Sequence, residues 1–227
     1  MFLDYYYIAW VLPAVLVALF AQIYLKSTFN SYRGKYNARG YTGAQVARKL
    51  LDDNGLSAIS IERVEGELTD HFDSNGQVVR LSASTYDSQS VAALGVAAHE
   101  VGHAIQYKEE YTPIKIRSAL VPVTNIGASL SFPLILVGLF LSADPLIYIG
   151  IALYSLMTLF QLVTLPVELN ASNRAMVALT GGGILFEEEA KGARKVLTAA
   201  AFTYVAALLV SLVQLLRLIA IFGRRRD

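Results

Sequence analysis

Four stretches of the chain contain no charged residue and are long enough to cross a lipid bilayer. They cover residues 5–25, 118–143, 145–167 and 196–216. A membrane-spanning helix needs about 20 consecutive apolar residues, so each stretch predicts one. Asp144 alone separates the second stretch from the third, which predicts a tight helical hairpin. A soluble protein with buried helices is the alternative, and four apolar runs of this length argue against it.

The polar residues between these runs define the expected domain organisation. We expect transmembrane helices at 1–25, 118–143, 145–167 and 196–222, a polar domain at 26–117, and a polar helical hairpin at 168–195. The start of the chain lacks the positive charges of a cleavable signal peptide, so the first run is expected to be a retained anchor.

The larger polar segment combines helix and strand signals. Thr42 can cap a helix that runs to about Asp53, and a short strand is expected around 59–64. The pair Asn75-Gly76 indicates a tight turn before a strand at 78–82, which predicts a β-hairpin. The edge at 78–82 either holds an extended peptide by strand addition or is merely structural. The expected fold is therefore mainly α: a polytopic membrane protein with four transmembrane helices and a small α+β zincin-like domain containing a short β-hairpin.

Composition narrows the function classes. Of 227 residues, 55% are hydrophobic, which is typical of a membrane protein with the lipid bilayer as partner. The chain has no cysteine, so disulfides and thiolate metal ligands are excluded. The net charge of +1 indicates no particular partner. No basic cluster with interleaved aromatic residues is present, so nucleic acid is not an expected partner.

Residues 99–103 read His-Glu-Val-Gly-His, which is the H-E-x-x-H pattern of zinc-binding helices. On a helix, positions i and i+4 share a face, so His99 and His103 can bind one Zn²⁺ ion. Glu100 beside them can take a proton from a water on the zinc. The alternative is a helix with two incidental buried histidines.

The flanking residues predict that this motif is helical. Ser88 or Ser90 can cap the helix start, and an apolar stripe continues along it. Gly95 and Gly102 lie on another side, near the histidines. Either another backbone approaches closely there, or the glycines reflect ordinary close packing of helices.

A catalytic zinc usually takes three protein ligands, so a third is needed. His71 is the only other histidine, and the acidic candidates are many. Glu168 stands out because it directly follows the third apolar run, on a segment tied to the same side of the membrane as the helix of His99. Ser172 is four residues later, so the two side chains share one helix face. The small Ala171 beside it would let this helix lie against Gly102. The alternative for Glu168 is a solvated carboxylate at the end of a span.

Several blocks together resemble the YugP-like zinc-dependent membrane proteases, which are bacterial neutral zinc metallopeptidases. The blocks are residues 70–73, 96–106, 165–175 and 192–201. The resemblance covers nearly the whole chain and implies a membrane-embedded, gluzincin-like site with Glu168 as third ligand. It also implies a multi-pass protein of the bacterial inner (plasma) membrane. The chain is distantly similar to the HtpX-like membrane proteases, which have Asp where this chain has Ser172.

The expected function is that of a zinc metalloprotease. Such an endopeptidase would hydrolyse unfolded or membrane-associated proteins through a zinc-activated water, with Glu100 as general base. The developing oxyanion needs a further donor, and Arg174 and His71 are the candidates. Alternatively Arg174 lies near lipid phosphates or in a salt bridge, and His71 braces the hairpin. The competing function is a non-enzymatic membrane adaptor with a structural zinc site. The sequence gives no oligomeric state.

The distribution of positive charge predicts the orientation. Four spans place both polar segments on one side and both termini on the other. The polar segments carry more lysine and arginine near the membrane, which marks the cytoplasmic side. Three arginines on the side of the termini favour the opposite orientation: Arg224, Arg225 and Arg226. We expect the zinc site to face the cytoplasm.

Overall fold

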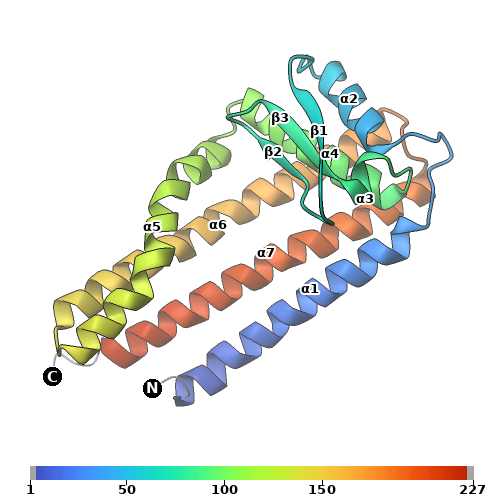
Figure 1. The fold of residues 1–227 in the computed structure, drawn as a ribbon. Coiled ribbons are helices and arrows are strands. Elements are labelled where there is room, and N and C mark those ends of the chain that lie inside the picture. Colours follow the sequence, from blue (N-terminus) through green and yellow to red (C-terminus); the bar gives the residue numbers. More distant parts are fainter. Residues whose placement is uncertain (1–3, 224–227) are drawn as a thin grey trace. The chain divides into compact units, whose positions relative to one another are not determined.

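The computed structural model describes residues 4–223, and these residues are mainly helical (Figure 1). A short π-helix, η1, covers Tyr7–Val11. The α-helices are α1 (Leu12–Arg33), α2 (Gly43–Asp53), α3 (Ala83–Tyr86), α4 (Val91–Lys108), α5 (Thr112–Phe140), α6 (Asp144–Gly181) and α7 (Glu187–Phe222). The strands are β1 (Ser60–Val64), β2 (His71–Asp73) and β3 (Val78–Ser82).

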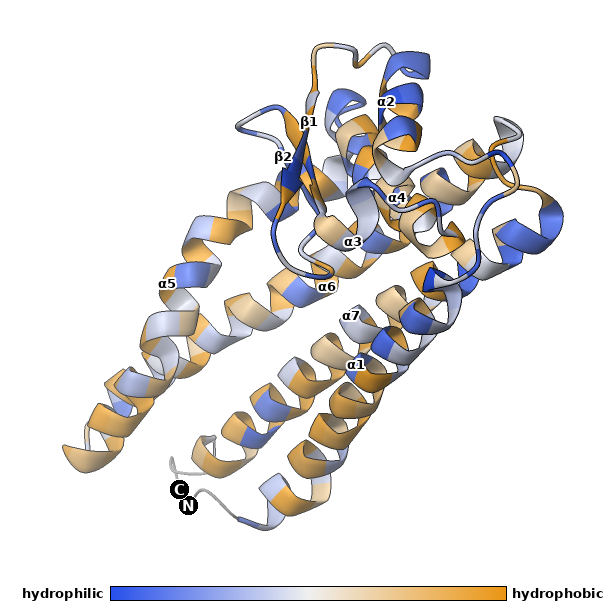
Figure 2. Ribbon diagram, turned by 45° about the vertical axis from the view of Figure 1, so that its right-hand side comes forward, coloured by the Kyte–Doolittle hydropathy of each residue, from blue (hydrophilic) through white to orange (hydrophobic). Residues whose placement is uncertain are grey.

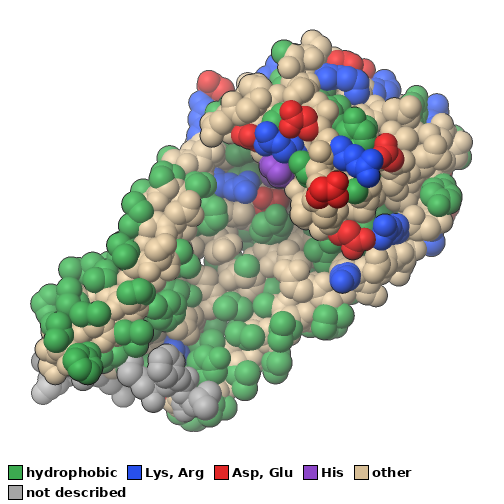
Figure 3. All heavy atoms as spheres, viewed as in Figure 1, with side chains coloured by type: hydrophobic (Ala, Val, Ile, Leu, Met, Phe, Trp, Pro, Cys, Tyr) green, Lys and Arg blue, Asp and Glu red, His purple; other side chains and the backbone are tan. Residues whose placement is uncertain are grey.

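Four helices of the described chain are long and apolar enough to cross a membrane, as the four uncharged runs predict. They are Tyr7–Arg33, Thr112–Phe140, Asp144–Gly181 and Glu187–Phe222. Figure 2 shows long hydrophobic stretches along them. In Figure 3 hydrophobic side chains cover much of the surface of the long apolar helices, and charged side chains gather over the sheet. α6 continues as one helix through residue 168, so Glu168 lies inside it.

The chain forms two compact units. Unit 1 contains the residues up to Gln22, residues 112–166, and the residues from Thr203 onward. Unit 2 contains residues 23–111 and 167–202. Every proposed zinc ligand belongs to unit 2.

In unit 1, α5 and α6 approach each other closely where glycines face the neighbouring helix. A Cβ added to Gly138 would lie 2.9 Å from the backbone nitrogen of Ile147, and one added to Gly150 would lie 2.7 Å from the carbonyl oxygen of Ser131. Small residues at such crossings let two membrane helices pack backbone to backbone. The turn at 141–143 joins the two helices, as expected for a helical hairpin.

In unit 2 the strands form one mixed sheet in the order β1-β3-β2. β2 and β3 are antiparallel, with His71 opposite Arg80, which confirms the predicted hairpin. β1 pairs with β3 in parallel, with Ser60 opposite Val78. The prediction that 78–82 offers a free edge is therefore wrong: β3 is the central strand. The parallel partner comes from earlier in the chain, which local turn signals do not reveal.

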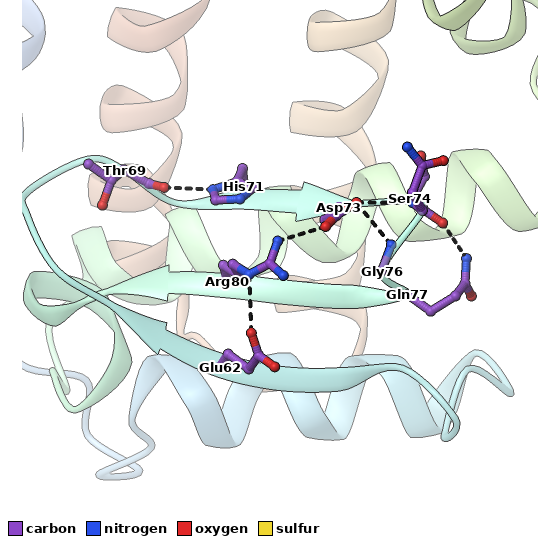
Figure 4. Close-up of polar contacts among 9 residues, drawn as sticks. Glu62, Thr69, His71, Asp73, Ser74, Gly76, Gln77 and Arg80 are labelled. Atoms are coloured by element: carbon purple, nitrogen blue, oxygen red, sulfur yellow. Dashed lines mark hydrogen bonds and ion pairs between the residues drawn. The ribbon is translucent and has the colours of Figure 1, made fainter.

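Polar contacts fix the hairpin turn and hold the three strands together (Figure 4). The Asp73 carboxylate accepts hydrogen bonds from the backbone nitrogens of Asn75 and Gly76, each at 3.0 Å. Arg80 on β3 pairs with Asp73 on β2 at 2.7 Å and with Glu62 on β1 at 3.1 Å. The backbone donors of Gly76 and the Arg80 guanidinium hold the pKa of the Asp73 carboxyl below its ordinary value.

The core of unit 2 lies where α2 and the sheet pack on α4. α2 begins at a capping box in which Thr42 and Gln45 bond each other's backbone. Its Leu51 is fully buried with Leu81 of β3 and Leu94 of α4. Burial of each such side chain contributes about 1.5–3 kcal/mol. This core fixes the helix that carries the His-Glu-Val-Gly-His motif.

Candidate metal centre

The motif lies on α4, as predicted, and Ser90 begins this helix. The Ser90 hydroxyl accepts a hydrogen bond from the backbone nitrogen of Ala93 at 3.1 Å. Ser88, the other predicted cap, instead donates its hydroxyl to the Ser90 hydroxyl at 3.1 Å. The cap and the buried apolar stripe fix the rotation of α4, which presents both motif histidines to α6.

Gly102 brings α4 and α6 into backbone contact. A Cβ at Gly102 would lie 2.8 Å from the carbonyl oxygen of Ala171 on α6, closer than real Cβ atoms approach. Of the two explanations for the glycines, close backbone approach is therefore correct at Gly102. Gly95 meets the Cβ of Ala193 on α7 at 3.3 Å, which is a tight but less demanding contact.

His99, His103 and Glu168 converge at this helix contact. The Oε2 atom of Glu168 lies 3.2 Å from Nε2 of His99 and 3.5 Å from Nε2 of His103. One ligand atom from each residue lies within 4.8 Å of the other two. Glu168 is only 2% exposed, so its carboxylate is not the solvated group that the alternative interpretation required.

Each histidine is held at its other ring nitrogen. The Ser172 hydroxyl lies 3.1 Å from Nδ1 of His99, and the Oε1 atom of Gln106 lies 3.0 Å from Nδ1 of His103. The amide oxygen of Gln106 can only accept, so it favours a proton on Nδ1 of His103 and leaves Nε2 for a metal ion. The Ser172 hydroxyl favours the same tautomer of His99 when it accepts from Nδ1. Partners of this kind orient metal-binding histidines and fix their tautomers.

Gln106 is itself fixed by α6. Its amide nitrogen donates to the carbonyl oxygen of Val167 at 2.8 Å and to the side-chain oxygen of Asn170 at 2.9 Å. Because the nitrogen has two acceptors there, the amide oxygen must face His103. Sequence reasoning gave neither Gln106 nor Asn170 a role at the site. Their only signal was a polar residue three positions after His103 and another two positions after Glu168.

The geometry fits a zinc ion. Zinc takes nitrogen and oxygen ligands at about 2.1 Å in a tetrahedral arrangement, so two ligand atoms lie about 3.4 Å apart. The separations of 3.2 Å and 3.5 Å from Glu168 to the two histidines agree with this value. Three such ligands would leave a fourth position open, as in catalytic zinc sites.

Glu100 lies next to His99 on α4 and is 8% exposed. Burial raises the pKa of its carboxyl above the ordinary value, and the charges of His99 and His103 oppose this shift. Raising a carboxyl pKa toward neutrality improves it as an acid and base near neutral pH.

The two candidate oxyanion donors have other partners. Arg174 on α6 donates Nε to Asn170 at 2.7 Å and pairs through Nη2 with Glu109 at 2.7 Å. His71 on β2 is exposed, and its Nδ1 lies 2.9 Å from the carbonyl oxygen of Thr69 (Figure 4). Arg174 thus joins the network that starts at His103, whereas His71 lies on the edge strand.

Comparisons with known proteins agree with this chemistry. Residues 7–223 match the protein family described as "Putative neutral zinc metallopeptidase". The chain is also 45% identical over 216 residues to "Putative membrane protease YugP" of Bacillus subtilis (strain 168). That match covers 95% of this chain and 96% of the relative. No solved structure matches the chain.

Proposed function

Because the chain belongs to the family of neutral zinc metallopeptidases, we propose that it is a membrane endopeptidase in which His99, His103 and Glu168 hold Zn²⁺. The observation that supports this most strongly is the convergence of three ligand atoms within 4.8 Å beside the buried Glu100. The site is gluzincin-like because two helical histidines are joined by a glutamate from a later helix.

Each residue of the proposed site has a distinct role in peptide hydrolysis. Zinc bound there would polarise the scissile carbonyl and lower the pKa of a water molecule. Glu100 acts as general base: it accepts a proton from the attacking water and passes it to the leaving amine. Its raised pKa suits both transfers. Gln106 favours the tautomer of His103 that offers Nε2, and Ser172 does the same for His99 when its hydroxyl accepts from Nδ1.

Stabilisation of the oxyanion is the second task for protein side chains. We propose Arg174 and His71 as the donors. Arg174 is held by Glu109 and Asn170, which supports a defined position for its guanidinium. His71 is proposed because it lies next to Phe72, whose ring contacts Tyr107 of the motif helix. Neighbouring strand residues point to opposite faces, so His71 would have to turn toward the site to donate.

The sheet also suggests how a polypeptide substrate binds. β3 is occupied on both sides, whereas β2 has a sheet partner on one side only among the described strands. An extended, unfolded segment can add to such an edge through backbone hydrogen bonds. We propose that substrates are unfolded or membrane-associated proteins that pair along residues 71–73.

We further propose that the protein resides in the bacterial plasma membrane with its zinc site on the cytoplasmic side. In this arrangement residues 26–117 and 168–195 lie outside the hydrocarbon core, and 1–25, 118–143, 145–167 and 196–222 form the spans. The charge difference between the two sides supports this orientation. The opposing arginines at 224–226 lie outside the described residues.

Substitutions at the motif test the proposed function. In purified protein, His99→Ala, His103→Ala and Glu168→Ala should each lose zinc, measured by elemental analysis. Glu100→Gln should keep zinc, lose cleavage of an unfolded reporter, and retain trapped substrates in its own membrane. Full cleavage activity of Glu100→Gln would refute the mechanism, whereas zinc binding without any cleavage by the wild type would favour the adaptor. The adaptor is disfavoured because structural zinc usually has four protein ligands, and the group found among the described residues has three.

A further inference from the structure

Unit 2 contains a cavity whose lining includes none of the proposed zinc ligands. Its volume is about 640 Å³, and it lies between the end of α1 and the first turns of α7. Tyr24, Tyr32 and Lys35 line it from α1 and the segment after it, and Arg194, Lys195 and Thr198 line it from α7. A cavity of this volume can hold a small organic group.

The cavity lining has four cations and two carboxylates, so it has an excess of positive charge. Two of its lining carboxylates are occupied: Glu188 pairs with Lys191 at 2.6 Å, and Glu189 accepts from the backbone nitrogens of Ala38 and Phe186 at 2.7 and 2.8 Å. Three other lining cations have no carboxylate partner within the described part of the chain. They are Lys35, Arg194 and Lys195.

The cations of α7 lie where the spans leave the bilayer. Lys195 directly precedes the apolar run 196–216, and Tyr24 is the second-last residue of the run 5–25. Tyrosine is enriched at this interfacial level of membrane proteins. From Lys191 to Lys195 α7 rises about 6 Å, which matches a headgroup layer roughly 5–8 Å thick. The cavity therefore extends from the hydrocarbon boundary, at Tyr24 and Thr198, into the headgroup layer.

We propose that this cavity binds the headgroup of an anionic phospholipid. Arg194 can bind a phosphodiester in a bidentate manner, with Lys195 supplying further charge. α1 rises about 14 Å from Tyr24 to Arg33, so Lys35 lies at the outer end of the cavity, beyond the headgroup layer. A soluble phosphate ester would meet the same cations, but it has no acyl chain to lie along the apolar run 196–216 that begins directly after Lys195. The site is independent of the proposed peptidase chemistry.

The lining also links the cavity to the motif helix. Val91, the first residue of α4, lines the cavity. The Cβ of Ala193, between the cavity residues of α7, would meet a Cβ on Gly95 at 3.3 Å. A bound headgroup would thus contact the same packed layer that positions α4, so lipid binding should raise the thermal unfolding midpoint.

Native mass spectrometry of the full chain tests the proposal. Detergent-solubilised protein is mixed with equal amounts of phosphatidylglycerol and phosphatidylcholine that have identical acyl chains. We expect the wild type to retain phosphatidylglycerol preferentially. The double variant Arg194→Gln/Lys195→Gln should lower that preference by roughly fivefold per cation removed. Thr198→Trp fills the inner wall without changing charge and should lower it as well.

A matched control separates a site from general attraction of positive charge. Lys26→Gln/Arg33→Gln removes two cations of α1 near the membrane that do not line the cavity. It should keep the wild-type preference, and circular dichroism should show native helicity in every variant. An equal loss in the control, or an unchanged preference in Arg194→Gln/Lys195→Gln, would overturn the proposal. Complete displacement of the lipid by millimolar glycerol phosphate would identify a soluble phosphate ester as the ligand and overturn the lipid assignment.

Discussion

Gly102 on α4 and Ala171 on α6 lie so close that a Cβ on the glycine would sit 2.8 Å from the alanine carbonyl oxygen. The contact sets the distance between the helix that carries His99 and His103 and the helix that carries Glu168. The chemistry of the proposed metal centre therefore depends on a packing contact that involves no ligand.

The first prediction follows from this contact. Gly102→Ala should push α6 away from α4, lower the free energy of unfolding by about 1–3 kcal/mol, and weaken zinc binding. Thermal unfolding and zinc competition titration measure the two effects. Gly95→Ala is the matched control on the same helix, because its new Cβ would meet the Cβ of Ala193 at 3.3 Å and the backbone oxygen of Ala193 only at 3.6 Å, an ordinary contact distance. Equal zinc affinity in both variants would contradict the prediction.

The second prediction concerns Ser172. Ser172→Ala removes the hydroxyl that bonds Nδ1 of His99, so zinc affinity should fall about 10- to 100-fold. Ser172→Asp supplies a stronger acceptor and should bind zinc at least as tightly as the wild type. Thr180→Ala, which removes a hydroxyl of α6 that bonds only within its own helix, serves as the control. Unchanged affinity in Ser172→Ala would show that the hydroxyl does not orient His99.

Gln106 provides the third prediction. Gln106→Leu keeps the approximate volume but leaves the carbonyl oxygen of Val167 and Nδ1 of His103 without their partner. Since Gln106 is fully buried, unfolding should become easier by about 1–3 kcal/mol. Zinc affinity should fall in parallel, because His103 loses the group that fixes its tautomer. A stable variant with a weakened zinc site would separate the orienting role from the packing role.

The fourth prediction separates two roles of Arg174. If its guanidinium stabilises the oxyanion, Arg174→Gln should lower kcat by at least 10-fold with little change in KM. Glu109→Gln, which removes only the ion-pair partner, should lower kcat far less. Equal losses in both variants would assign Arg174 to holding Glu109 and Asn170 in place. His71→Ala, assayed in parallel, should have a smaller effect on kcat than Arg174→Gln.

Orientation in the membrane is the subject of the last prediction. The chain has no cysteine, so Ser74→Cys in the β2–β3 turn and Ser142→Cys in the α5–α6 turn each introduce a single thiol. With a cytoplasmic zinc site, a membrane-impermeant thiol reagent should label Ser142→Cys on intact cells, and Ser74→Cys only after lysis. Labelling of Ser74→Cys on intact cells would reverse the orientation.

Features encoded by neighbouring residues could be predicted from the sequence. The apolar runs, the Thr42 and Ser90 caps, the turn at Asn75-Gly76 and the i, i+4 spacing of His99 and His103 each depend on a few adjacent positions. Hydrophobic periodicity and backbone preferences act at that range. Even the approach of α6 to Gly102 was foreseeable, because small residues on two segments indicate a close helix contact.

Tertiary structure alone decided the features that join distant segments. β3 is central because β1, from earlier in the chain, pairs beside it in parallel, and no turn signal links the two. His99 meets Glu168 across 69 positions and Ser172 across 73, while Gln106 reaches Asn170 across 64. Such contacts depend on the rotation and spacing of two packed helices. The packing of many side chains together sets both quantities, so no single motif encodes them.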